Sequence, residues 1–181
     1  MNRQLEHTII FSEEIWEDTV QDLINEISKY TYVNLYFSTG GGRLDCMGIL
    51  IDFLNHRVKS QSLKLTLFDF VCSAGTLIFL DYEGQIFVKD LRGLLFHAPD
   101  MNTPTIRKDK TTKRLEERLY QENELFYQRL LSLGLTKAEI KKISDGDDVL
   151  LFTEDLHRIK RDLFVAEETE TTHYVITKPT K

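Results

Sequence analysis

A serine stands where a strand-like apolar segment gives way to a helical one. Ser73 follows the strand predicted over 63–71 and opens the helix predicted over 73–80, within the run Cys72-Ser73-Ala74-Gly75. A tight turn here would present the hydroxyl in the partly positive field of a helix N-terminus, with the N–H of Ala74 pointing the same way. A nucleophile needs this setting, although an ordinary N-capping serine has the same sequence context.

A histidine stands at the end of the next apolar segment. The run Leu94-Leu95-Phe96-His97-Ala98-Pro99 predicts a strand that delivers His97 to its carboxyl end. Open parallel sheets gather their active sites at the carboxyl ends of strands, and histidine is the usual general base near neutral pH. The alternative is a buried histidine bonded to backbone. The other histidines lack this setting and are expected at the surface: His7, His56, His157 and His173.

A glycine run follows the strand predicted over 32–37. The glycines of Ser38-Thr39-Gly40-Gly41-Gly42 would let the backbone turn sharply and expose N–H groups to an anion or an oxyanion. The alternative is a flexible turn into the next helix. The run is no phosphate-binding P-loop, because no Gly-Lys-Ser/Thr follows, and Gly48 comes too late for a dinucleotide fingerprint.

Three aspartates later in the chain could supply the third member of a catalytic group. Asp145, Asp147 and Asp148 follow a helix predicted to open at the capping box Thr136-Lys137-Ala138-Glu139. A carboxylate beside a histidine orients the ring and stabilises its charged form. For each of the three, a solvated loop is the alternative.

Strand and helix patterns alternate through the first half of the chain. Short β-branched and aromatic runs predict strands over 8–11, 32–37, 63–71, 85–89 and 93–97. Apolar residues at helical spacing predict helices over 13–30, 45–58 and 73–80. This alternation predicts an α/β fold of βαβ units around a largely parallel sheet.

The second half is predicted to be mainly helical. A long amphipathic helix is expected over 111–133, and a last helix begins near 152–155. Residues 1–166 are expected to form one domain. The polar tail over 167–181 either adds an edge strand within 172–176 or is disordered.

The composition argues against a nucleic-acid-binding, a metal-binding and a membrane-spanning protein. The chain has 181 residues, of which 41% are hydrophobic and 29% charged, and a net charge of -6 that argues against nucleic acid as the main partner. No Cys/His cluster has metal-ligand spacing, and Cys46 and Cys72 are expected as buried structural thiols. No apolar run of about 18 residues and no signal-peptide pattern is found, so we expect no membrane segment and a cytoplasmic location.

Four segments in order resemble the Clp protease proteolytic-subunit family. The family's Ser-Pro-Gly-Gly, its following helix, its Ala-Ser-Met-Gly and its Met-Ile-His-Gln-Pro are similar to residues 38–41, 48–54, 72–75 and 95–99. The resemblance covers about Thr8 to Leu163. The chain departs from the family at Thr39, where proline is usual, and lacks the family's glycine-rich stretch after the histidine.

The resemblance implies a fold and a set of roles. The fold would be the ClpP/crotonase-like one, with stacked ββα units and a long protruding helix. Ser73 would be the nucleophile, His97 its base and Asp148 the orienting acid of a serine peptidase. The N–H groups of Gly41 and Ala74 would form the oxyanion hole. No metal and no cofactor is implied.

The resemblance also implies assembly. Family members stack as rings that enclose their active sites, with ring contact through the helix that here spans about 111–133. Peptides or unfolded proteins would be the substrates, and an AAA+ unfoldase a possible partner. Two other functions stay open. One is a ClpP-like scaffold without peptidase activity, and the other is a crotonase-like enzyme that stabilises enolates of acyl-CoA thioesters.

Overall fold

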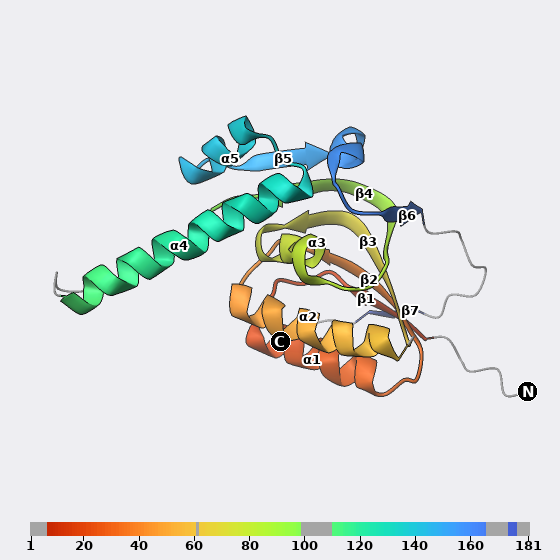
Figure 1. Ribbon diagram of the computed structural model, residues 1–181. Helices are drawn as coiled ribbons and strands as arrows, with labels where there is room; N and C mark the ends of the chain where they lie inside the picture. The colour runs from red at the N-terminus through yellow and green to blue at the C-terminus, as the bar shows by residue number, and fades with distance from the viewer. Residues whose placement is uncertain (1–6, 61, 99–109, 166–173, 177–181) are drawn as a thin grey trace, which may run out of the picture.

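Four apolar strands form the centre of the fold, because both faces of each carry buried side chains. The computed structural model describes residues 7–60, 62–98, 110–165 and 174–176. The central strands are β1 (His7–Phe11), β2 (Val33–Thr39), β3 (Leu63–Cys72) and β4 (Ile86–Phe96). They pair in parallel, in the order β4-β3-β2-β1 across the sheet (Figure 1). The predicted α/β class with a largely parallel sheet is confirmed.

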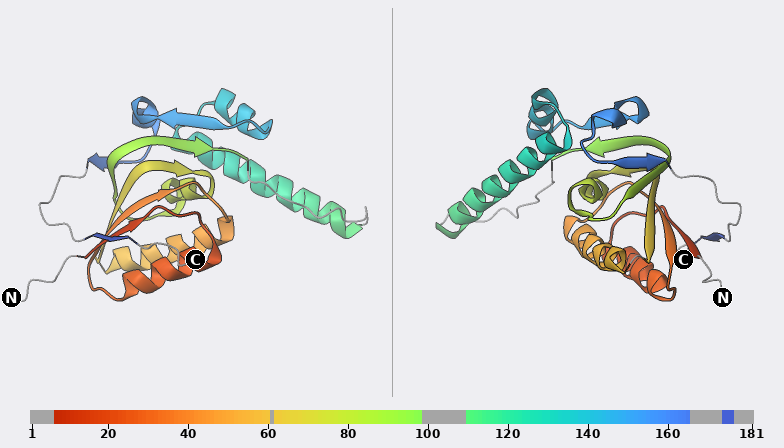
Figure 2. Two further views of the ribbon diagram at one scale, coloured as in Figure 1. Left: turned by 180° about the vertical axis from the view of Figure 1, so that it is seen from behind. Right: turned by 45° about the vertical axis from the view of Figure 1, so that its right-hand side comes forward.

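Two amphipathic helices cover one face of this sheet (Figures 1 and 2). They are α1 (Glu17–Ser28) and α2 (Leu44–Lys59). Helix α1 turns Val20, Leu23 and Ile27 into the core. The helix predicted from residue 13 begins only at Glu17, because Ile15 instead forms a β-bridge with Gly42.

The segment after β3 is more tightly wound than the sequence predicts. The helix expected over 73–80 is a 3-10 turn, η1 (Ser73–Leu77), followed by a single α-helical turn, α3 (Ile78–Asp81). The two strands expected over 85–89 and 93–97 are one continuous strand, β4. Its polar centre is tolerated because the β3–β4 register shifts beside Asp69, and both Asp69 and Asp90 have positive φ.

The remaining elements lie at the β4 side of the sheet. They are α4 (Lys110–Leu133), α5 (Lys137–Ser144), β5 (Val149–Phe152), η2 (Thr153–Arg158) and β6 (Leu163–Val165). Helix α4 runs outward from the body of the fold (Figures 1 and 2), and Arg129 on it forms an ion pair with Asp81 of α3. Residues 153–158, predicted to begin a helix, form a 3-10 segment.

The edges of the sheet are closed by short strands. Strand β5 pairs antiparallel with β4, and β6 pairs parallel with the start of β4. The strand β7 (Tyr174–Ile176) pairs with β1, within the segment predicted as an edge strand. In the part of the chain that the structure describes, no helix is long and apolar enough to span a membrane.

Candidate active site

The serine and the histidine meet because their strands are neighbours in the sheet. Strand β3 ends at Cys72 and β4 at Phe96, and the parallel register places Cys72 opposite Leu95. Ser73 and His97 are therefore the first residues beyond two adjacent strands, at the carboxyl edge of the sheet. The Ser73 Oγ lies 2.5 Å from His97 Nε2, a short hydrogen bond.

Ser73 sits on a sharp turn that aims its hydroxyl. Its φ is +52°, a left-handed backbone conformation that residues other than glycine, asparagine and aspartate seldom adopt. The hydroxyl of Thr76 donates to the Ser73 carbonyl at 2.7 Å and holds the turn. A glycine at 75 is required next to it, since a Cβ there would lie 2.4 Å from Thr39 Cγ2.

Of the three candidate aspartates, Asp148 lies nearest the histidine ring. The antiparallel pairing of Phe96 with Val149 carries the preceding Asp148 to the end of β4. Its Oδ1 is 3.9 Å from His97 Nδ1, within ion-pair range but longer than a hydrogen bond. The carboxylate is 62% exposed. Asp145 pairs with Lys141 at 2.8 Å, and Asp147 has no side-chain partner within the described ranges.

Among the described residues, the other histidines and the two cysteines take no part in the contacts among Ser73, His97 and Asp148. His56 and His157 are exposed as predicted, and His173 falls outside the described residues. His7 differs from the prediction, because its ring is half-buried and stacks on Tyr30 at 3.6 Å. Cys46 is buried as predicted, whereas Cys72 is only half-buried. Burial raises the pKa of both thiols, which favours the protonated, unreactive form. No three or more His, Cys, Asp or Glu residues within the described ranges could hold a metal ion.

The glycine loop packs directly against the serine. Gly41 has a φ of +109°, and a Cβ on it would lie 2.4 Å from Ser73 Cβ. The hydroxyl of Ser38 donates to the Phe70 carbonyl at 2.9 Å, which ties the loop to β3. The N–H of Gly41 donates to Thr39 Oγ1 at 3.1 Å in a buried hydrogen bond. The loop predicted as an oxyanion site thus lies beside Ser73, with one of its N–H groups already bonded.

Two backbone hydrogen bonds to Ile15 clamp the other side of the loop, a contact that the sequence does not predict. Ile15 N–H donates to the Gly41 carbonyl at 2.7 Å, and Arg43 N–H donates to the Ile15 carbonyl at 2.9 Å. Together they fix the peptides on both sides of Gly42. The sequence carries no signal for this contact, because Ile15 fits the apolar spacing of the helix that follows it.

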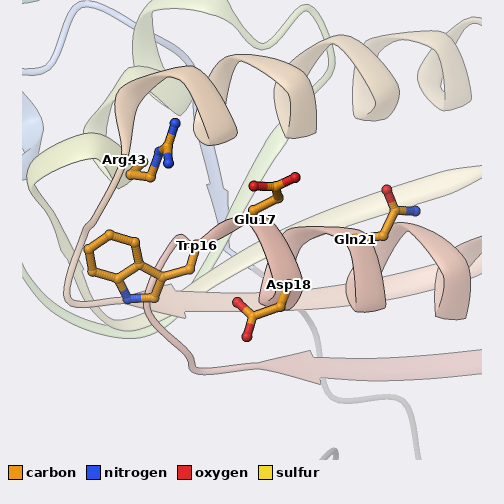
Figure 3. Close-up of a pocket in the computed structure, with 5 residues that line it drawn as sticks. All are labelled: Trp16, Glu17, Asp18, Gln21 and Arg43. Carbon is orange, nitrogen blue, oxygen red and sulfur yellow. The ribbon is translucent and has the colours of Figure 1, made fainter.

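An open pocket lies beside the clamp, between the starts of α1 and α2 (Figure 3). Its lining consists of Trp16, Glu17, Asp18, Gln21 and Arg43. The Arg43 guanidinium is held by both oxygens of Asp45, at 3.0 and 2.6 Å, and this pairing lowers the pKa of Asp45 to about 2. The free charges of the pocket are therefore those of Glu17 and Asp18.

The arrangement at the sheet edge can support acyl transfer. A hydroxyl on a strained turn touches an imidazole, and a carboxylate lies on the far side of that ring. The Ala74 N–H begins a 3-10 turn, where the first N–H groups lack an intrahelical acceptor. The adjoining glycine loop lies against the same residue, because a Cβ on Gly41 would come within 3.0 Å of Ser73 Oγ.

Comparison with known proteins identifies the fold. No protein-family model matches the chain, and no curated protein matches its sequence. The crystal structure of the ClpP protease catalytic domain from Plasmodium falciparum matches with a TM-score of 0.55 and 20% sequence identity. The match covers 92% of this chain and 88% of that chain. The chain therefore has a ClpP-like fold.

Proposed function

We propose that this chain is a serine peptidase of the Clp type. The observation that carries the proposal is the 2.5 Å contact between Ser73 Oγ and His97 Nε2 at the carboxyl edge of a ClpP-like sheet. A serine that only capped a helix would need neither a contact with a histidine from the next strand nor a left-handed backbone.

The geometry supports the following reaction. His97 Nε2 takes the hydroxyl proton as Ser73 Oγ attacks a peptide carbonyl, and the Asp148 carboxylate stabilises the imidazolium that results. The Ala74 N–H and an N–H of the glycine loop bind the oxyanion of the tetrahedral intermediate. His97 then gives its proton to the leaving amine. Water, activated by the same ring, releases the acyl group and restores the serine.

Substrate and assembly belong to the same proposal. The substrates would be peptides or unfolded proteins, processed inside a homo-oligomeric ring, with an AAA+ unfoldase as a possible partner. Helix α4 supports a role in assembly, because Tyr120 and Leu125 on it are 68% and 63% exposed. The cytoplasmic location stays a prediction.

One observation favours a second candidate, a ClpP-like scaffold without peptidase activity. Asp148 lies 3.9 Å from His97 Nδ1 and is largely exposed, so it does not hold the ring as a buried, hydrogen-bonded aspartate would. In that case the oligomer would serve as an assembly or binding partner.

The test is labelling of the purified full chain with a fluorophosphonate probe, followed by mass spectrometry of the modified peptide. An adduct on Ser73, lost in Ser73→Ala, supports the peptidase. Ser144→Ala is the matched control, because Ser144 is an exposed serine that donates to the Lys141 carbonyl, remote from any histidine contact. No adduct, in protein shown to be folded and oligomeric, favours the scaffold.

A further inference from the structure

The N–H of Gly41 is already bonded in this site. It donates to Thr39 Oγ1 at 3.1 Å, and both residues are buried. An oxyanion must lie about 2.7–3.1 Å from its donors. The Thr39 oxygen therefore occupies the place in front of the Gly41 N–H that a substrate oxyanion would need.

The next N–H of the loop points to the serine side. The Gly41 carbonyl accepts from Ile15, and in a planar trans peptide the following N–H points the opposite way. Ile15 follows β1, Ser73 follows β3, and β2 lies between these strands in the sheet. The parallel bridge of Ile15 with Gly42 thus directs the Gly42 N–H toward the β3 side, where Ser73 stands.

Gly41 and Gly42 also differ in solvent exposure and in the hydrogen bonding of their N–H groups. Gly42 is exposed whereas Gly41 is buried. Within the described ranges, the Gly42 N–H has no hydrogen-bond acceptor. Only glycine fits here, because φ is +140° and a Cβ would lie 2.3 Å from the Ile15 carbonyl oxygen.

We propose that Gly42, in place of Gly41, supplies the loop N–H of the oxyanion hole, opposite the N–H of Ala74, and that Ile15 is its positioning residue. The assignment rests on the proposed peptidase function. The Ile15 N–H also polarises the Gly41–Gly42 peptide, since a carbonyl that accepts a hydrogen bond makes the N–H of its own peptide a stronger donor.

A pair of backbone esters tests the assignment. Glycolic acid incorporated at 42 or at 41 by cell-free translation of the full chain removes one N–H and keeps the shape of the loop. We expect the ester at 42 to lower the rate of Ser73 phosphonylation and of peptide hydrolysis by roughly 10²–10³-fold, the effect of losing one oxyanion donor. The ester at 41 should have a much smaller effect on the rate. Thermal unfolding of both esters separates loss of rate from loss of fold.

The outcomes distinguish this assignment from the proposed function. If wild-type Ser73 reacts and the ester at 41 is the slower variant, the peptidase stands and the Gly42 assignment is overturned. If wild-type Ser73 does not react at all, the peptidase itself is wrong and the assignment falls with it.

Thr39→Val gives an independent check, because valine keeps the methyl group that packs on Gly75 and removes only the hydroxyl. With Gly42 as the donor, the rate should stay within about threefold of wild type. A gain of about tenfold would show a released Gly41 N–H at work, and a loss of about 10²-fold would assign the donor to the Thr39 hydroxyl. The gain would still agree with a Gly41 N–H that Thr39 blocks in the wild type, whereas the loss would overturn the proposal.

Discussion

Ser73 and His97 are 24 residues apart in the chain, yet their side chains approach to 2.5 Å because two adjacent parallel strands end together. The contact requires Ser73 to hold a φ of +52°. For a residue that carries a Cβ, that conformation costs on the order of 1–2 kcal/mol. A strained residue that persists at a strand end, in contact with a histidine, is a reason to suspect function.

The left-handed backbone of Ser73 predicts that replacement by glycine costs less stability than replacement by alanine, while both variants lose activity. Ser73→Gly and Ser73→Ala should both lose the fluorophosphonate adduct. Ser73→Gly should be more stable than Ser73→Ala by about 1 kcal/mol, because glycine adopts positive φ without a Cβ clash. Urea unfolding of the two variants measures the difference.

A second positive-φ residue provides the control for this comparison. Asp90 has a φ of +51° in the middle of β4, away from the candidate site. Asp90→Gly should exceed Asp90→Ala in stability by a similar amount and keep the labelling of Ser73. Equal stability of the Ser73 variants would show that the turn relaxes once the hydroxyl is gone.

Asp148→Asn is predicted to slow the reaction while leaving the fold unchanged. An amide cannot stabilise the imidazolium and favours the wrong ring tautomer, an effect of up to about 10⁴-fold where the aspartate is buried and bonded. The 3.9 Å separation and the exposure of Asp148 predict a smaller loss here, roughly 10²-fold. The measurement is the rate of hydrolysis of a fluorogenic peptide.

The neighbouring aspartates are the matched controls. Asp145→Asn breaks a surface pair with Lys141, and Asp147→Asn changes an exposed side chain, so neither should alter the rate by more than about twofold. A larger loss at Asp145 or Asp147 than at Asp148 would show that another carboxylate reaches the ring during catalysis.

The sequence locates Ser73 and His97 because both follow apolar strand patterns, and the carboxyl edge of a parallel sheet is where such residues gather. It leaves the three aspartates undecided. The choice among them depends on the register of β5 against β4, where Val149 pairs with Phe96. Strand β5 is only four residues long, too short for a periodic pattern to predict.

Backbone contacts around the loop are equally invisible in the sequence. The clamp from Ile15 to Gly41 and Arg43 uses main-chain atoms, which every residue type offers. Likewise, the sequence predicts two strands over 85–89 and 93–97 where the structure has the single strand β4. Bulges beside Asp69 and Asp90 let the pairing continue through it.

Gly41→Ala is predicted to disable the site, whereas Gly40→Ala is not. A Cβ at 41 would lie 2.4 Å from Ser73 Cβ and 3.0 Å from Ser73 Oγ, on a backbone with a φ of +109°. The hydroxyl must then move away from His97, and phosphonylation of Ser73 should fall by at least about tenfold. A Cβ at Gly40 meets nothing within 4 Å, so that variant should label like wild type. Equal labelling of both variants would mean that the loop shifts to accommodate a Cβ at position 41 without displacing the Ser73 hydroxyl.

The ion pair of Glu139 with Arg158 predicts how stability responds to acid. Burial raises the pKa of Glu139, but hydrogen bonds from Arg158, at 3.0 and 3.2 Å, and from Thr136 outweigh it and lower the pKa to about 2. Because the folded-state pKa is depressed, the carboxylate stabilises the fold above the unfolded pKa of about 4.3. That contribution is lost as the pH falls from about 4.3 toward 2.

Glu139→Gln isolates this contribution. At pH 7 the variant should be less stable than wild type by roughly 1–2 kcal/mol, the scale of a partly screened, charged hydrogen bond. The difference should shrink as the pH falls toward 2, where wild-type Glu139 also loses its charge. Urea unfolding at pH 7, 4 and 2.5 measures it, with Glu154→Gln as the control at an exposed carboxylate. A difference that does not change with pH would attribute the loss to the capping box with Thr136, which a neutral glutamine disturbs at every pH.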